Sequence, residues 1–185
     1  MATVREGKRD VVLVVDFQNG VVASAWDREA VAAHIRTVVA KARAAGVPVV
    51  WVRHADEELV PGSPEWEIDP SLRPGADEPR IEKKFNSSFE ETGLENLLAG
   101  LGATRIVLMG AVTNFCIRST AYAAVERGYD LALVGDAHTT DSKVLPDGSV
   151  IEARDVIRDM NRTIRWMSYP GRKNETVGSD ELAFD

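Results

Sequence analysis

The chain has one cysteine, Cys116, at a place where its thiol could act as a nucleophile. It follows a predicted strand and opens a predicted helix whose cap is Thr113 or Asn114. In the first turn of a helix, unpaired N–H groups and the positive end of the helix dipole favour a thiolate and lower the pKa of the thiol. The same N–H groups could hold an oxyanion. Taken alone, however, a free cysteine is most often a small buried apolar residue.

An acid and a lysine could support such a thiol. Asp16 directly follows the apolar run Val11–Val15, where a carboxylate is costly unless it is paired or used. Its alternative role is to cap the following turn. Lys83 and Lys84 end a short predicted strand and point to opposite faces, so one of them can point inward and stabilise a thiolate. The simpler interpretation is that both lysines are solvated surface charges.

Other chemistries receive little support from the residues. His34 lies in a predicted helix, and His54 and His138 follow strands without the paired spacing of a metal site. Gly110 and Gly128 are too far apart to belong to a glycine-rich phosphate loop. We therefore expect neither a metal nor a cofactor.

Composition indicates one globular domain over residues 1–185, with 44% apolar and 28% charged residues. The net charge of −7 argues against nucleic-acid binding, which relies on clustered basic side chains. The longest apolar stretch, Ala44–Val52, is far shorter than the ~20 residues of a membrane-spanning helix. The first residues also lack the apolar centre of a signal peptide. We expect a small-molecule substrate, no membrane partner and a cytoplasmic location.

Short apolar runs alternate with helical periods along the chain. The expected strands are Val11–Val15, Val47–Val52, Ile81–Lys83, Arg105–Met109 and Leu131–Val134, with an edge strand possible after Tyr169. Helices are expected after Asp27 up to Gly46, over 117–128, and behind the capping boxes Thr92-x-x-Glu95 and Ser149-x-x-Glu152. This alternation predicts a three-layer α/β/α, Rossmann-like fold with a mostly parallel sheet of five to six strands.

Two segments stand outside this alternation. Residues 54–80 hold five of the eight prolines and are expected to form a long loop, either a lid over a pocket or a surface excursion. Residues 170–185 are a C-terminal extension. Ligands of such folds bind beyond the carboxyl ends of the strands, which directs attention to the residues after the first and fourth strands.

The order of Asp16, Lys83 and Cys116 after the first, third and fourth strands resembles the isochorismatase-like cysteine hydrolases. The resemblance covers about residues 11–169, and its segments are Val14–Asn19, Lys83 with Asn86–Phe89 and Thr92–Leu94, Gly110–Cys116 with Thr120–Ala121, and Gly135–His138. It implies a triad of Asp16, Lys83 and Cys116. Lys83 is chosen over Lys84 because it stands four residues before the serine of a Ser-x-Phe element.

The resemblance also implies backbone features and an assembly. A cis peptide bond is expected between Val112 and Thr113, and the N–H groups of Val112 and Cys116 would form an oxyanion hole. Homodimers or homotetramers are common among such relatives. Candidate pocket walls are Phe17, Trp66 and Phe115, with His138 nearby, although each aromatic residue could equally pack in the core.

The implied activity is hydrolysis of a small amide through a thioester on Cys116, with Asp16 moving the protons. Nicotinamidases of this family carry an Asp-x-His metal element, which is missing from Trp51–Asp56, so nicotinamide is not expected. Two alternatives stay open: vinyl-ether hydrolysis with Asp16 as the acid, and a silent binding protein. The usual strand order 3-2-1-4-5 separates the third strand from the fourth, so Lys83 must reach across.

Overall fold

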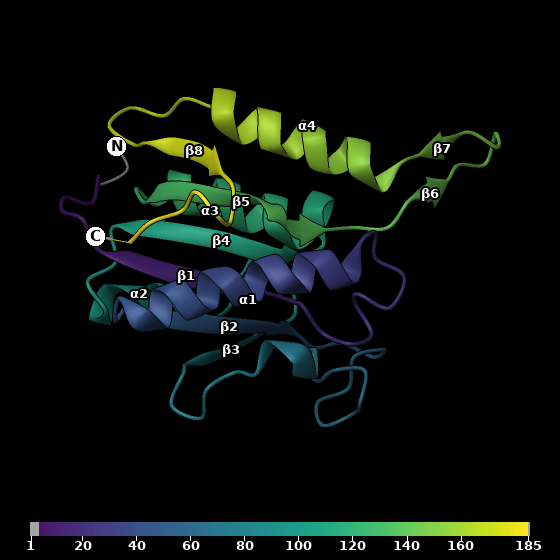
Figure 1. Ribbon diagram of the computed structural model, residues 1–185, viewed down its shortest axis with the longest axis horizontal. Coiled ribbons are helices and arrows are strands. Elements are labelled where there is room, and N and C mark those ends of the chain that lie inside the picture. Colours follow the sequence, from purple (N-terminus) through teal and green to yellow (C-terminus); the bar gives the residue numbers. More distant parts are fainter. Residues whose placement is uncertain (1–3, 185) are drawn as a thin grey trace.

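Six parallel strands form the central sheet, in the order β3-β2-β1-β4-β5-β8 (Figure 1). They are β1 (Asp10–Val15), β2 (Val49–His54), β3 (Arg80–Lys83), β4 (Arg105–Ala111), β5 (Asp130–Thr139) and β8 (Asn174–Val177). The computed structural model describes residues 4–184. The expected parallel sheet is confirmed, including the edge strand after Tyr169.

Helices cover both faces of the sheet, which gives the expected three layers. They are α1 (Arg28–Ala44), α2 (Leu94–Gly100), α3 (Arg118–Glu126) and α4 (Ala153–Trp166). Strand β1 is buried on both sides: Val12 and Val14 belong to the core under α1, and Leu13 belongs to the core under α2 and α3. Alternate residues of a strand face opposite sides of a sheet, so a continuous apolar run suits this position.

The start of α2 differs from the expected capping box. Its N-cap is Gly93, which has no side chain to accept a hydrogen bond. The Thr92 hydroxyl instead donates to the Ser88 carbonyl over 2.6 Å and accepts from the Leu94 N–H over 3.3 Å. Thr92 thus precedes the N-cap, and its hydroxyl bonds to Ser88 and Leu94 instead of capping Glu95. The predicted Thr92–Glu95 capping box is therefore wrong.

The second capping box is also wrong, because Ser149 lies in a hairpin. Strands β6 (Lys143–Val144) and β7 (Val150–Ile151) pair antiparallel ahead of α4, and the sequence does not reveal them. The Ser149 hydroxyl donates to Asp147 inside the hairpin turn. The N–H of Ala153, the first residue of α4, donates instead to Ser142.

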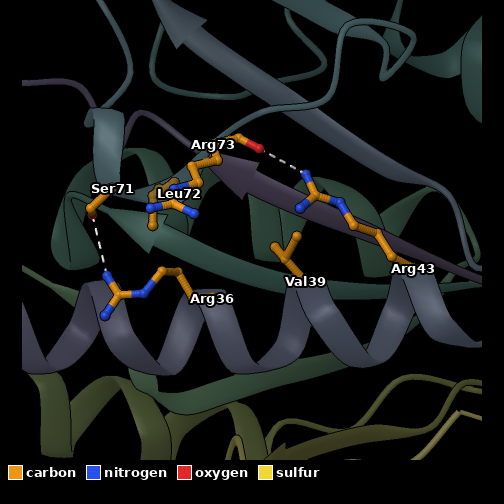
Figure 2. Close-up of a pocket in the computed structure, with 6 residues that line it drawn as sticks. All are labelled: Arg36, Val39, Arg43, Ser71, Leu72 and Arg73. Atoms are coloured by element: carbon orange, nitrogen blue, oxygen red, sulfur yellow. Dashed lines mark hydrogen bonds between the residues drawn. The ribbon is translucent and has the colours of Figure 1, made fainter.

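The loop between β2 and β3 covers residues 55–79, one residue less at each end than the expected 54–80, and it is tied to the rest of the domain. Arg28 of α1 forms an ion pair with Asp69 over 2.7 Å, just before the short 3₁₀ turn η1 (Pro70–Leu72). A cavity of about 520 Å³ lies between this turn and α1 (Figure 2). Its lining residues are Arg36, Val39, Arg43, Ser71, Leu72 and Arg73. It is therefore separate from the residues expected to do chemistry.

Within residues 4–184, no helix has the length and apolar character needed to cross a membrane.

Candidate active site

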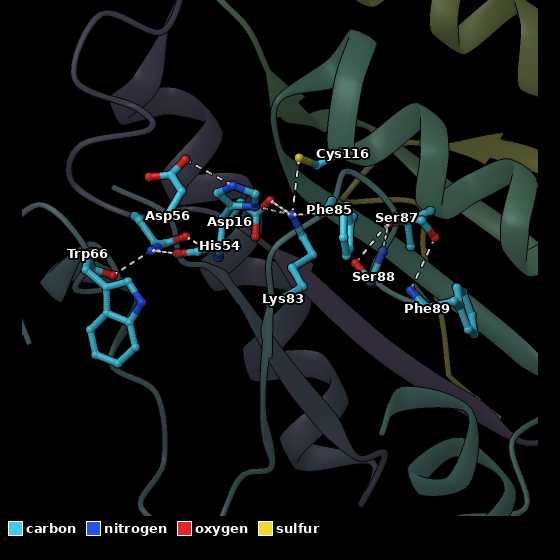
Figure 3. A network of polar contacts seen from close by, with 12 residues as sticks. Asp16, His54, Asp56, Trp66, Lys83, Phe85, Ser87, Ser88, Phe89 and Cys116 are labelled. Atoms are coloured by element: carbon cyan, nitrogen blue, oxygen red, sulfur yellow. Dashed lines mark hydrogen bonds and ion pairs between the residues drawn. The ribbon is translucent and has the colours of Figure 1, made fainter. Parts of the chain in front are cut away.

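The three residues of the expected triad lie together at the carboxyl ends of the strands. Asp16 directly follows β1, Lys83 is the last residue of β3, and Cys116 lies in the turn after β4. Lys83 Nζ is 2.6 Å from Asp16 Oδ2 and 3.3 Å from Cys116 Sγ (Figure 3). The strand order puts β2 between β3 and β1, and the long lysine side chain reaches past the end of β2 to make both contacts.

This cluster is shielded from water. The side chains of Lys83 and Asp16 are 0% and 1% exposed, and Cys116 is 8% exposed. Lys84 is exposed, so the inward lysine is Lys83, as the alternation of side chains along a strand requires of one of the two. Coulomb attraction between the ammonium and the carboxylate is strong in such a setting, because little water screens it.

Burial sets the ionisation of the acid and the thiol. It raises the pKa of Asp16, although the neighbouring Lys83 ammonium acts in the opposite direction. Burial, followed by the negative charge of Asp16, raises the pKa of Cys116 to about 12. The expected lowering of the thiol pKa by a helix N-terminus is therefore wrong, because the cost of removing the thiolate from water outweighs it. The resting thiol needs a base, and Asp16 is the adjacent one.

The turn that carries Cys116 is unusual in shape. Residues Thr113–Ile117 form one π-helical turn before α3, rather than a regular helical first turn. The Val112 carbonyl accepts hydrogen bonds from the N–H groups of Phe115 and Ile117 over 3.1 and 3.2 Å. The cis peptide bond lies between Ala111 and Val112. Its expected place between Val112 and Thr113 is wrong by one residue, since the cis bond directly follows the last residue of β4.

Gly110 allows β1 and β4 to approach closely beside this turn. It has φ of 125°, and a Cβ atom there would lie 2.0 Å from the Val15 carbonyl oxygen. Any side chain would push the end of β4 away from the end of β1. The glycine therefore holds the strand that carries Cys116 close to the strand that carries Asp16.

The three aromatic residues expected in a pocket take different positions. Phe17 is 1% exposed and packs in the core cluster on the α1 face, whereas Cys116 belongs to the cluster on the opposite face. Trp66 is buried beneath the guanidinium of Arg53, which lies 3.4 Å from the centre of its ring. Phe115 is 42% exposed and lies next to Cys116 in the chain. Of the three, Phe115 is the one that combines exposure with proximity to the thiol.

His138 contacts the turn that carries Cys116. It is 1% exposed, and its Nδ1 lies 2.9 Å from the Thr113 hydroxyl while its Nε2 lies 2.9 Å from Asn161 Oδ1. Burial lowers the pKa of His138 to about 4, so the ring is neutral near pH 7. One ring nitrogen donates and the other accepts, and the ring thereby links the Cys116 turn to α4.

Two further residues, His54 and Gln18, belong to the cluster, although the sequence pattern did not predict them as members. His54 Nδ1 lies 3.1 Å from Lys83 Nζ, because His54 and Lys83 are partners in the register of β2 and β3. Gln18 is fully buried and forms two hydrogen bonds with the backbone of His54 and one with the Trp66 carbonyl. The signals available in the sequence were a polar residue two positions after Asp16 and a histidine ending a strand.

A cavity of about 280 Å³ lies beside Lys83. Its lining residues are Ala55, Pro61, Glu82, Lys83, Lys84, Phe85 and Glu91. The loop between β2 and β3 thus borders the space next to the lysine. Across residues 4–184, no group of three or more histidine, cysteine or acidic side chains is arranged to hold a metal ion.

Fold and site together define an α/β/α protein with a buried Asp-Lys-Cys cluster, and comparison with known proteins identifies its family. The family model described as "Isochorismatase domain" matches residues 10–160, so the chain belongs to the isochorismatase family. Streptothricin hydrolase from Streptomyces noursei is 36% identical over 146 residues, which are 74% of this chain and 52% of that protein. The chain therefore spans about half the length of this relative.

Two other relatives match over more of their length. Ureidoacrylate amidohydrolase from Methylorubrum extorquens is 26% identical over 92% of this chain and 84% of its own. The crystal structure of a cysteine hydrolase from Pseudomonas syringae pv. phaseolicola has a TM-score of 0.84 at 24% identity, covering 94% of this chain and 90% of that one. At that identity the structural match establishes the shared fold.

Proposed function

We propose that this chain is a hydrolase that cleaves a small amide through a thioester on Cys116. The observation that carries the proposal is the position of the Lys83 ammonium, 2.6 Å from the Asp16 carboxylate and 3.3 Å from the only thiol in the chain. The names of the two relatives support hydrolysis, and the name amidohydrolase supports an amide as the bond that is cleaved.

The first half-reaction forms the acyl-enzyme. Asp16 takes the proton of the Cys116 thiol as the sulfur attacks the amide carbon. Throughout this step, Lys83 balances the negative charge that Asp16 and Cys116 share. The N–H groups of Val112 and Cys116 are candidates to hold the oxyanion. As the carbon–nitrogen bond breaks, Asp16 gives its proton to the leaving nitrogen, which departs as ammonia or an amine.

The second half-reaction returns the enzyme to its starting state. A water molecule attacks the thioester carbon while Asp16 accepts one of its protons. The carbon–sulfur bond then breaks, the acid is released, and the proton held by Asp16 returns to the sulfur. Because Asp16 and Cys116 both contact the buried Lys83 ammonium, the proton can pass between them without leaving the site.

One observation favours the alternative of vinyl-ether hydrolysis. The raised pKa of Asp16 helps that residue to hold and donate a proton, and Cys116 would then take no part in the reaction. Substitution of the thiol separates the two mechanisms, because the alternative predicts normal turnover by a Cys116→Ala variant.

The proposal is tested with a panel of small primary amides and ureido acids, assayed for release of ammonia. We expect the unaltered chain to release ammonia from at least one compound and the Cys116→Ala variant to lose at least about 10³-fold in kcat. Turnover of an amide by Cys116→Ala at the unaltered rate would overturn the covalent mechanism. Slower alkylation of Cys116 by iodoacetamide when the substrate is present would support it.

A further inference from the structure

His54 lies between the ammonium group of Lys83 and the carboxylate of Asp56 (Figure 3). Its Nδ1 is 3.1 Å from Lys83 Nζ, and its Nε2 is 3.2 Å from Asp56 Oδ2. The side chain of His54 is 17% exposed, while that of Asp56 is 45% exposed. A chain of polar contacts therefore runs from the surface at Asp56 to the buried Asp16 and Cys116.

These contacts fix the tautomer of the imidazole ring. An ammonium group carries N–H donors and no acceptor, so the Nδ1 atom that faces Lys83 must offer its lone pair. The ring proton then lies on Nε2, where it donates to the Asp56 carboxylate. Asp56 is held in turn by the N–H groups of Glu58 and Leu59, which donate to its other oxygen over 2.9 and 2.7 Å.

The backbone of His54 is held as firmly as its ring. The Gln18 side chain accepts from the His54 N–H over 2.7 Å and donates to the His54 carbonyl over 2.9 Å. Because Gln18 is fully buried and follows Asp16 by two residues, the imidazole is anchored to the same segment that carries the acid.

We propose that His54 is a positioning residue, with its tautomer set by Asp56, that aims the Lys83 ammonium at Asp16 and Cys116. The ammonium has three N–H groups, and the Phe85 carbonyl at 3.1 Å is a further acceptor. The imidazole and this carbonyl together hold the Lys83 ammonium within reach of the acid and the thiol. This inference rests on the proposed function for its effect on turnover, and its structural part can be tested without a substrate.

The spectroscopic test is ¹⁵N NMR of the histidine rings of the full chain. With three histidines in the chain, the His54 signals are assigned by their loss in a His54→Asn variant. We expect the Nε2–H tautomer of His54 near pH 7.5. Observation of the Nδ1–H tautomer or of the doubly protonated ring at that pH would overturn the proposal.

The matched variants are His54→Leu, His54→Asn, Asp56→Asn and Glu57→Ala. Leucine removes the acceptor for Lys83, whereas the asparagine oxygen can replace Nδ1. Asp56→Asn can still cap its turn through one oxygen, but it then turns an N–H donor toward the Nε2–H of His54. Glu57→Ala is the control, since it removes the same charge from the next residue, which is exposed.

We expect kcat to fall about tenfold or more in His54→Leu and Asp56→Asn, which matches the loss of one hydrogen bond to a charged group. KM should change little, His54→Asn should recover most of kcat, and Glu57→Ala should match the unaltered chain. Alkylation of Cys116 by iodoacetamide should slow most in His54→Leu and Asp56→Asn, less in His54→Asn, and not at all in Glu57→Ala. Unchanged kcat and alkylation in His54→Leu would overturn the proposal. If no amide is turned over, the proposed function fails, while the tautomer and alkylation still decide this inference.

Discussion

The Lys83 ammonium and the Asp16 carboxylate are 2.6 Å apart, and both side chains are closed off from solvent. Such a pair gains its attraction only while both charges are present, since each alone is costly to bury. Each member therefore needs the other in the folded domain, and the pair is also the centre of the proposed reaction.

Removing one member of this pair should destabilise the fold. We expect Lys83→Met to lower the free energy of unfolding by about 3–5 kcal/mol, because it leaves a buried carboxylate unpaired. The double variant Asp16→Asn with Lys83→Met should recover part of that loss while staying inactive. Urea unfolding measures both. Lys84→Met is the matched control on the exposed neighbour and should stay within about 0.5 kcal/mol of the unaltered chain.

The reactivity of Cys116 should rise steeply with pH. With a thiol pKa of about 12, the alkylation rate by iodoacetamide should increase about tenfold per pH unit between pH 7 and 10. Mass spectrometry follows the reaction without ambiguity, since the chain has one cysteine. A rate that levels off near pH 7 would show instead that the helix N-terminus and Lys83 dominate over burial.

Stability should depend on pH through His138. Its folded pKa of about 4 lies below the usual value of 6.5, so the unfolded chain binds the proton more readily. Stability from this group is complete above pH 6.5 and is lost as pH falls toward 4, by about 3 kcal/mol in total. Urea unfolding between pH 4 and 7 should show this loss in the unaltered chain, and His138→Gln should lack most of it. Equal pH slopes for both proteins would contradict the assignment.

Gly110 should tolerate no side chain. Gly110→Ala places a methyl group against the Val15 carbonyl, and we expect it to cost about 3 kcal/mol or more. Gly148→Ala is the control, since Gly148 also has a positive φ, of 83°, but open space around it. It should cost about 1 kcal/mol from backbone strain alone. Thermal unfolding of the two variants compares them, and equal losses would mean that the close approach of the strands has little effect on stability.

Much of the fold could be predicted because its signals are local. The β-branched run of β1 is buried on both faces, and the sequence shows this directly. The side-chain alternation in β3 likewise allowed one of Lys83 and Lys84 to point inward. The choice between them came from the family resemblance.

The remaining features depend on contacts between distant segments. His54 contacts Lys83 through the register of β2 against β3, which no local pattern contains. Ser149 and Thr92 matched capping boxes but found other partners, and the thiol pKa follows from burial by the folded chain. Phe17, Trp66 and Phe115 differ in exposure for the same reason.

The most direct test of the proposed function is the intact mass of the protein during turnover. After rapid acid quenching in the presence of a cleaved amide, the unaltered chain should carry one acyl group, removable by hydroxylamine and mapped to Cys116. Cys116→Ala should carry none. An amide that is hydrolysed at full rate while Cys116 stays unmodified and can be substituted without loss would contradict the account.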